Sequence, residues 1–247
     1  MLLIFDLDDT LVVTHPIFMR LTEQFLDEMR GLGLWDEQLY PTLDAIDRGI
    51  IEQAGEYVPW AFPQAMRRTY TVYCEKMGVP YDEQQAAHFE ELGGSFAGAY
   101  HPPVPGAHAL LAALRAAGHC MLLLTQGGCK EQLFKVEQHD LGRYFDEVIV
   151  VGKKTVEVYR EIIAHYGAEP GQTVVIGNSL KSEVAPALAV GAQAIHLQVD
   201  IAWAYEDAEV AGEYRQVRTL AEVGALLGVD IDGQPCCGRH KIQDENE

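Results

Sequence analysis

From about residue 106 onward, the sequence alternates between helical periodicity and short apolar runs. The segments with apolar residues three or four apart are about 106–117, 129–138, 155–166 and 181–190, and the apolar runs that follow them are 120–124, 147–151, 173–176 and 194–197. This alternation predicts right-handed βαβ units, whose strands share one parallel sheet. A further amphipathic segment at 219–228 predicts a last helix.

The N-terminal run Leu2-Leu3-Ile4-Phe5 predicts another strand of this sheet, because an apolar run without alternation is typical of a strand buried on both faces. Between this run and residue 106 we find helical spacing only, at about 16–31, 36–53, 62–78 and 82–99. We therefore expect an α/β fold with a Rossmann-like parallel-sheet core, helices on both faces and a mostly α-helical cap insert. The expected division is 1–14 and 101–230 for the core, 15–100 for the cap and 231–247 for a polar tail, possibly disordered.

Composition and charge restrict the class of partner. Of the 247 residues 48% are hydrophobic, which is ordinary for a globular protein, and the formal net charge is −19. A surface this acidic repels nucleic acids and anionic membranes, so neither is expected as a partner. No apolar run approaches the roughly 20 residues that cross a bilayer, and the N-terminus lacks the basic start of a signal peptide. A cytoplasmic location is expected, and monomer and homodimer both remain open.

The five cysteines indicate free thiols rather than a disulfide framework, because their number is odd and Cys236 and Cys237 are adjacent. With His240 this pair could suggest a metal site, but the spacing fits no structural zinc pattern. A polar tail is the simpler interpretation.

Three carboxylates follow the first predicted strand directly. If the backbone stays extended, Asp6 and Asp8 point the same way and Asp9 points the opposite way. Open α/β sheets bind ligands at the carboxyl ends of their strands, and two converging acids repel each other unless a cation, most simply a divalent metal, lies between them. The alternative is that Asp8-Asp9-Thr10 is only a polar turn that caps the next helix.

Polar residues also follow three later strands. Thr125-Gln126-Gly127 could hold an anion through a hydroxyl and backbone N–H groups, although any strand-to-helix turn favours such residues. Lys153 or Lys154 could bring positive charge to the cleft or could be a solvated loop lysine. Asn178 and Glu183 offer oxygen ligands for a hard cation, or they belong to a helix cap.

In their order and spacing, these four strand ends resemble the motifs of haloacid-dehalogenase-superfamily hydrolases over residues 1–200. The first motif, Asp-x-Asp-x-Thr, is matched fully by Asp6 to Thr10, and the second by Thr125. The third is matched by Lys154, or by Lys153, with Tyr159 following. The fourth, Gly177 to Glu183, is imperfect, because Asn178 and Glu183 stand where two aspartates are usual. A helical cap between the first and second motifs is typical of one large subgroup.

The resemblance implies a Mg²⁺-dependent phosphatase that acts on a small phosphorylated metabolite through an aspartyl-phosphate. Asp6 would be the nucleophile, and Asp8 would protonate the leaving alcohol and later activate water. The implied phosphate contacts are Thr125, Gln126, Gly127 and Lys154, and the implied metal site is formed by Asp6, Asp8, Asn178 and Glu183. Lys154 is preferred to Lys153, because Thr155 and Tyr159 then follow at a spacing seen in some members.

Asp8 distinguishes between activities within the superfamily. Members that break carbon–halogen bonds lack this second acid and need no metal, so the resemblance favours a phosphatase over a dehalogenase. A phosphomutase would share all four motifs, and a non-catalytic binding protein on the same fold is the alternative from another class. Asn178 is uncharged, so either Asn178 or Glu183 could complete the metal site.

Substrate choice is expected to come from the cap, which would close over the site and exclude water. The candidates for facing the cleft are Thr14, His15, Arg20, Trp60 and Arg67. For Arg20 and Arg67 a solvated helix face is the simpler interpretation, and for Trp60 a place in the cap core.

Overall fold

This computed structural model describes residues 1–199 and 210–231 of the chain. The expected tail lies outside this part, with Cys236, Cys237 and His240, except for Ile231, which is buried in the core. Within the described part, Cys74, Cys120 and Cys129 are free thiols.

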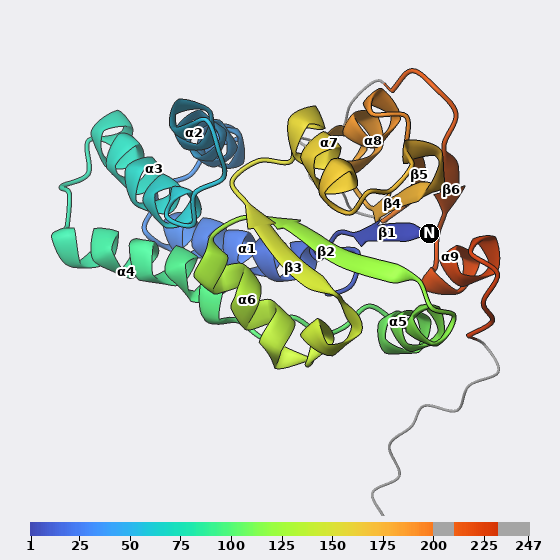
Figure 1. The fold of residues 1–247 in the computed structure, drawn as a ribbon. Helices are drawn as coiled ribbons and strands as arrows, with labels where there is room; N and C mark the ends of the chain where they lie inside the picture. The colour runs from blue at the N-terminus through green and yellow to red at the C-terminus, as the bar shows by residue number, and fades with distance from the viewer. Residues whose placement is uncertain (200–209, 232–247) are drawn as a thin grey trace, which may run out of the picture.

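Within the described residues, six parallel strands form one sheet in the order β3-β2-β1-β4-β5-β6 (Figure 1). Their bounds are β1 Leu2–Phe5, β2 Cys120–Gln126, β3 Glu147–Val151, β4 Thr173–Gly177, β5 Gln193–Leu197 and β6 Arg215–Val217. The first five are the apolar runs that predict strands, so the predicted Rossmann-like α/β fold is confirmed. The N-terminal strand β1 lies in the centre, hydrogen-bonded to β2 and β4, and its carboxyl end therefore has strand ends on both sides.

Alternate residues of β1 pack on opposite faces of the sheet, as the uninterrupted apolar run predicts. Leu3 and Phe5 join a core cluster with α5 (Ala107–Ala116), α9 (Leu220–Leu226) and Val136 of α6 (Cys129–Gln138). Leu2 and Ile4 join a second cluster with α7 (Val156–His165) and α8 (Ala185–Ala189). Figure 1 shows α7 and α8 on one side of the sheet and α5 and α6 on the other.

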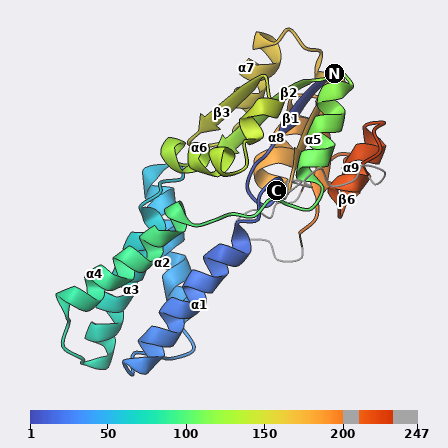
Figure 2. The ribbon, with the colours of Figure 1, turned by 90° about the horizontal axis from the view of Figure 1, so that it is seen from below.

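The segment between β1 and α5 is helical and has a hydrophobic core of its own. It contains α1 (His15–Gly31), α2 (Leu39–Ala54), α3 (Ala61–Met77) and α4 (Glu83–Gly94), whose apolar faces pack around Phe25, Met29, Phe89 and their neighbours. Figure 2 shows these helices to one side of the sheet. Among residues 1–199 and 210–231, no helix combines the length and the apolar character that a membrane span requires.

Three details differ from the sequence prediction. The helix predicted at 82–99 ends at Gly94 and continues as a 3₁₀ turn, Ser95–Gly98. The helix predicted at 181–190 begins with a π-helical turn, Leu180–Val184, before α8. Strand β6 has no counterpart in the prediction, because only three residues pair and two of them are exposed, so no apolar run marks it.

Two connecting segments join helices α1 to α4 to the sheet and are hydrogen-bonded to each other. The backbone N–H of Val13 donates to the Pro102 carbonyl at 2.8 Å, and the N–H of Val104 donates to the Leu11 carbonyl at 2.8 Å. His101 lies in this connection and is fully buried, with its ring edge-on to Phe96 at 5.3 Å between centroids.

We expect His101 to make the protein less stable toward acid pH. Neither ring nitrogen has a hydrogen-bond partner within the described residues, and burial, with a further contribution from Lys135, lowers the pKa of His101. Because the unfolded chain then binds a proton more readily, stability falls as the pH drops through the ordinary histidine range. In urea unfolding at pH 7.5 and 5.5, His101→Phe should lose less stability between the two pH values than wild type.

The matched control is His165→Phe, since His165 is exposed at the end of α7. This control should keep the wild-type pH dependence of the free energy of unfolding. An equal loss of stability on acidification in His101→Phe and wild type would contradict the prediction.

Candidate active site

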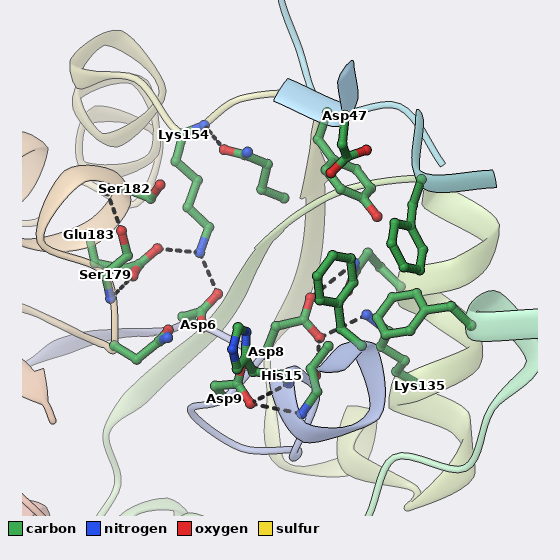
Figure 3. A pocket seen from close by; sticks show the side chains of 18 residues that line it. Asp6, Asp8, Asp9, His15, Asp47, Lys135, Lys154, Ser179, Ser182 and Glu183 are labelled. Atoms are coloured by element: carbon green, nitrogen blue, oxygen red, sulfur yellow. Dashed lines mark hydrogen bonds and ion pairs between the residues drawn. The ribbon is translucent and has the colours of Figure 1, made fainter. Parts of the chain in front are cut away.

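A cavity lies where the carboxyl ends of the central strands meet the cap helices (Figure 3). Residues reach it from the segments that follow β1, β2, β3 and β4, and residues of the helical segment between β1 and α5 complete the lining. Its lining comprises Asp6, Asp8, Asp9, Thr14, His15, Phe18, Asp47, Tyr57, Phe62, Phe96, Gln126, Gln132, Lys135, Lys154, Asn178, Ser179, Ser182 and Glu183. The topology therefore brings at least one residue from each of the four motifs to one place.

Asp6 follows β1 directly and is held on both of its carboxylate oxygens. The Thr10 hydroxyl donates to Oδ2 at 2.8 Å, and Lys154 Nζ donates to Oδ1 at 2.5 Å. Burial raises the pKa of Asp6; the charge of Lys154 opposes this rise and that of Asp8 adds to it. The carboxylate is thus fixed in orientation, and additional positive charge nearby would favour its ionised form.

Lys154, rather than Lys153, is the lysine of this site. Its Nζ lies between two carboxylates, 2.5 Å from Asp6 Oδ1 and 2.8 Å from Glu183 Oε1, and its backbone N–H donates to Gln126 Oε1 at 3.0 Å. Although burial alone would lower the pKa of Lys154, the two carboxylates raise it well above its ordinary value, so the side chain carries its charge. Lys153 is exposed and does not line the cavity.

Asp8 lines the same cavity and accepts three hydrogen bonds. Lys135 Nζ and the Thr14 hydroxyl each donate to Oδ1 at 2.8 Å, and Gln132 Nε2 donates to Oδ2 at 3.1 Å. Burial would raise the pKa of Asp8, but Lys135 and the other donors outweigh it and lower the pKa. Asp8 is therefore positioned by partners different from those of Asp6.

Lys135 is a site residue that sequence reasoning missed. It lies on α6, is 1% exposed, and forms with Gln132 and Val136 the buried face of that helix. The sequence carried no clear signal for it, because the buried face of α6 is mostly polar, while Leu133 and Phe134 of the same helix are exposed.

Replacement of Lys135 by methionine should lower kcat/KM of any reaction that uses Asp8 by about tenfold to hundredfold. A charge-assisted hydrogen bond between buried groups is worth about 1.5–3 kcal/mol, and its loss leaves Asp8 with Thr14 and Gln132 as donors but without a counter-charge. Steady-state kinetics on wild type, Lys135→Met and Lys130→Met test this. Lys130 is exposed on the same helix, so its variant should behave as wild type. Equal kcat/KM in all three would show that Lys135 has no role in positioning Asp8.

Asp9 corrects one geometric expectation. The extended backbone ends at Phe5, Asp9 adopts a left-handed conformation at φ 54°, and its side chain lines the same cavity instead of pointing away from it. Its Oδ1 accepts the backbone N–H groups of Thr14 at 2.8 Å and His15 at 2.9 Å, at the start of α1. Burial raises the pKa of Asp9 to about 6. The helix-cap alternative thus describes Asp9, whereas Asp6 and Asp8 face lysines.

Thr125 lies beneath the cavity rather than in its lining. It is fully buried, and its hydroxyl donates to Gln132 Oε1 at 3.0 Å, so it must rotate away from Gln132 to donate to a phosphoryl oxygen. The Gly127 N–H donates to the Val151 carbonyl at 3.0 Å. Gln126 does line the cavity.

The fourth motif separates Asn178 from Glu183. Both oxygens of Glu183 are occupied, Oε1 by Lys154 and Oε2 by the Ser179 N–H at 2.8 Å. The Thr10 hydroxyl lies 2.8 Å from Asp6 Oδ2 and 3.4 Å from Asn178 Oδ1, so the amide oxygen lies close to the Asp6 carboxylate. His196 Nε2 lies 2.9 Å from the backbone carbonyl oxygen of Asn178.

These oxygens fit a Mg²⁺ ion that keeps most of its water. Within the described residues, no group of three or more His, Cys, Asp or Glu side chains is arranged to hold a metal. Mg²⁺ does not require such a group, because it commonly takes one or two carboxylates and retains several waters. The Asp6 carboxylate and the Asn178 amide oxygen are donors that the site offers, with Glu183 serving as a counter-charge to Lys154.

On the cap side, the lining is mostly aromatic. Phe18, Tyr57, Phe62 and Phe96 line the cavity, together with the carboxylate of Asp47. Of the cap candidates from the sequence, Thr14 and His15 are in the lining, whereas Arg20, Trp60 and Arg67 are not. The core position suggested for Trp60 is wrong, because this side chain is 47% exposed. Arg67 pairs with Glu83 and Glu90.

Comparison with known proteins identifies relatives over most of the chain. Residues 1–191 match the family of haloacid dehalogenase-like hydrolases. A glyceraldehyde 3-phosphate phosphatase of Pyrococcus abyssi is 24% identical over 198 residues, covering 77% of this chain and 78% of the relative. A phosphoserine phosphatase of Thermus thermophilus is 27% identical over 250 residues, covering 90% and 97%. The crystal structure of a haloacid dehalogenase-like family hydrolase from Xanthomonas campestris superposes with a TM-score of 0.76 at 25% identity, covering 92% and 94%.

Proposed function

This chain belongs to the haloacid dehalogenase-like hydrolases, and from that premise we propose that it is a Mg²⁺-dependent phosphatase of a small phosphorylated metabolite. The observation that carries the proposal is the second carboxylate, Asp8, in the same cavity as Asp6. A departing alcohol needs a proton, and a second acid beside the nucleophile can deliver it. The phosphatase names of the two curated relatives support the same class of reaction.

In the first step, a carboxylate oxygen of Asp6 attacks phosphorus in line with the ester bond. The bond between phosphorus and the alcohol oxygen breaks, and Asp8 transfers a proton to that oxygen. The negative charge of the bound phosphate would raise the pKa of Asp8, which its hydrogen-bond donors lower in the free protein. The phosphoryl group is then an acyl phosphate on Asp6. Lys154 and Thr10 orient the attacking carboxylate from its two oxygens, and this fixed orientation lowers the entropic barrier to attack.

In the second step, Asp8 takes a proton from a water molecule, and the resulting hydroxide attacks phosphorus. The bond between phosphorus and the Asp6 oxygen breaks, which releases inorganic phosphate and restores the Asp6 carboxylate. Lys135, Thr14 and Gln132 keep Asp8 in place during both proton transfers. Gln126 lines the cavity and is proposed to contact the phosphoryl oxygens. Thr125, buried beneath the lining, is proposed to contact them after its hydroxyl rotates away from Gln132.

We propose that Mg²⁺ is held by the Asp6 carboxylate, the Asp8 backbone carbonyl and the Asn178 amide oxygen. When bound there, the ion supplies positive charge that offsets the repulsion between the phosphate dianion and the nucleophile. The positive charge of Lys154 also offsets this repulsion. The side chain is buried and contacts the Asp6 and Glu183 carboxylates, so its charge lies next to the nucleophile.

Residues 15–100 are proposed to act as a cap on a core formed by 1–14 and 101–230. The loop after α2 supports this role, because it contacts the core beside the cavity. The Tyr57 N–H donates to the Gly152 carbonyl at 3.1 Å, and the Pro59 ring lies over Gly128, where an added Cβ would approach it to 2.3 Å. Glycine at 128 therefore permits the cap loop to close on the core.

Hydrolysis of p-nitrophenyl phosphate in Mg²⁺, in EDTA and after Mg²⁺ is restored tests the proposal. We expect turnover with Mg²⁺, loss in EDTA and recovery on readdition, followed by phosphate release from members of a phosphorylated-metabolite panel. Turnover that EDTA does not affect would contradict the metal requirement. The absence of turnover with every phosphate ester would contradict the phosphatase itself, and halide release from a 2-haloacid would indicate the dehalogenase alternative.

Thermal melting provides a readout that does not depend on turnover. A ligand that binds the native state raises the melting temperature by mass action. Millimolar Mg²⁺ together with inorganic phosphate should raise the melting temperature of wild type more than either alone. No shift would favour a binding protein that retains the fold without the chemistry.

A further inference from the structure

Asp47 is a buried acid in the proposed substrate cavity that the phosphatase chemistry does not use. It lies on α2, is 6% exposed and lines the cavity on the cap side. Figure 3 shows its carboxylate across the cavity from Asp6 and Glu183. Its Oδ1 is buried and has no hydrogen-bond partner within the part of the chain that the structure describes.

A buried carboxylate without a partner is costly, so its presence beside a ligand cavity requires a cause. The unfavourable burial is reflected in its titration, because desolvation, with a smaller effect from Asp44 on the same helix, raises the pKa of Asp47 to about 7. A cation or a strong donor on the ligand would replace the water that Asp47 has lost.

Among the described residues, the charges that line the cavity are predominantly negative. They are five carboxylates, Asp6, Asp8, Asp9, Asp47 and Glu183, and two lysines. Both lysines are already engaged, Lys135 with Asp8 and Lys154 with Asp6 and Glu183. From the cap, within the described residues, no lysine or arginine reaches the lining.

The remaining cap-side lining suits the carbon body of a small ligand. The Phe18 and Phe62 rings pack with centroids 4.2 Å apart, and Tyr57 and Phe96 complete the aromatic wall. Aromatic faces also attract cations, which adds to the preference for positive charge. Within the described part of the chain, a second anionic group on the ligand would find no lysine or arginine of the helical segment in the cavity lining.

We infer that Asp47 binds a protonated amine on the leaving group, so that the substrate is the phosphate monoester of an amino alcohol. This inference rests on the proposed phosphatase function and adds the identity of the group opposite the phosphate. The phosphate is proposed to lie beside the contacting pair of Asp6 and Lys154, and the ammonium group pairs with the unpartnered Oδ1 of Asp47 on the opposite side of the cavity.

Three phosphate esters of equal length test the charge that is recognised: 2-aminoethyl phosphate, 2-hydroxyethyl phosphate and phosphoglycolate. The comparison of amine with hydroxyl is repeated with 3-aminopropyl phosphate and 3-hydroxypropyl phosphate, because the longer chain allows for a greater distance between the phosphate and Asp47. For wild type we expect kcat/KM to be at least about tenfold higher for the amine than for the hydroxyl ester. Phosphoglycolate, which carries a carboxylate in place of the amine, should be the poorest substrate.

The specific readout is the ratio of kcat/KM for the amine to that for the hydroxyl ester in each protein. Asp47→Asn should lower this ratio at least about tenfold from that of wild type, while Asp44→Asn, one turn away and paired with Arg48 at the surface, should keep the wild-type ratio. Both esters are measured in one preparation, so a smaller folded fraction cancels within each ratio. The intrinsic difference between leaving groups cancels when the ratio of a variant is divided by that of wild type.

Two results would overturn the inference: a wild-type ratio near one at both chain lengths, or a wild-type preference for the amine that survives in Asp47→Asn. Failure of the phosphatase proposal would give a different result, because then neither p-nitrophenyl phosphate nor any of the alkyl phosphate esters would be hydrolysed. If Asp47→Asn does not fold, the wild-type ratios at the two chain lengths still decide.

Discussion

Asp6→Asn should abolish turnover, lowering kcat for any phosphate ester at least about 1,000-fold, as removal of a nucleophile does in other enzymes. An amide in place of the carboxylate is a poor nucleophile for phosphorus, while it keeps the size of the side chain and an oxygen that can still accept from Thr10. Steady-state assays with p-nitrophenyl phosphate measure the loss.

The fold of this variant should survive, because Lys154 retains the Glu183 carboxylate as a counter-charge at 2.8 Å. A melting temperature close to that of wild type would confirm that the lost activity is chemical. If Asp6→Asn turned over within about tenfold of wild type, Asp6 would not be the nucleophile.

Lys154→Met should cause the largest loss of stability, about 3–5 kcal/mol in the free energy of unfolding. Lys154 is 6% exposed and is the cation held between two buried carboxylates, Asp6 at 2.5 Å and Glu183 at 2.8 Å. Its removal leaves both acids buried without that counter-charge. Urea unfolding in EDTA at pH 7 measures the effect without compensation from a bound cation, and kcat should fall together with the stability.

Lys153→Met is the matched control, one residue away and exposed. It should unfold within about 0.5 kcal/mol of wild type, as surface substitutions usually do. The double variant Lys154→Met/Glu183→Gln should regain part of the lost stability, since one of the two uncompensated charges is then absent. Equal unfolding free energies for Lys154→Met and Lys153→Met would contradict the role assigned to Lys154.

The sheet could be predicted from the sequence because each of its first five strands contains a short, mostly apolar run. A strand buried on both faces needs apolar side chains on both of them, as β1 has at every position and β4 has at Val174, Val175 and Ile176, and this leaves a local pattern. Strand β6 has one buried residue in three and leaves no such pattern. Its pairing depends on the neighbouring strand β5 and could not be read locally.

The site could be predicted only where its residues follow strands. Asp6, Lys154 and Asn178 come after β1, β3 and β4, so a parallel sheet alone places them together. Lys135 and Asp47 lie inside helices, and their positions in the cavity depend on how α6 and α2 pack. Both are charged residues on a buried helix face, and the sequence does not show which partner each one meets.

Direct detection of the phosphorylated nucleophile tests the central claim. Wild type turning over p-nitrophenyl phosphate with Mg²⁺ would be quenched in acid, reduced with borohydride and digested, so that an aspartyl-phosphate is converted to homoserine and located by mass spectrometry. We predict homoserine at Asp6 in wild type, and none in Asp6→Asn or in wild type without substrate. Phosphate release by wild type with no modification at Asp6, or with the modification at another carboxylate, would contradict the mechanism.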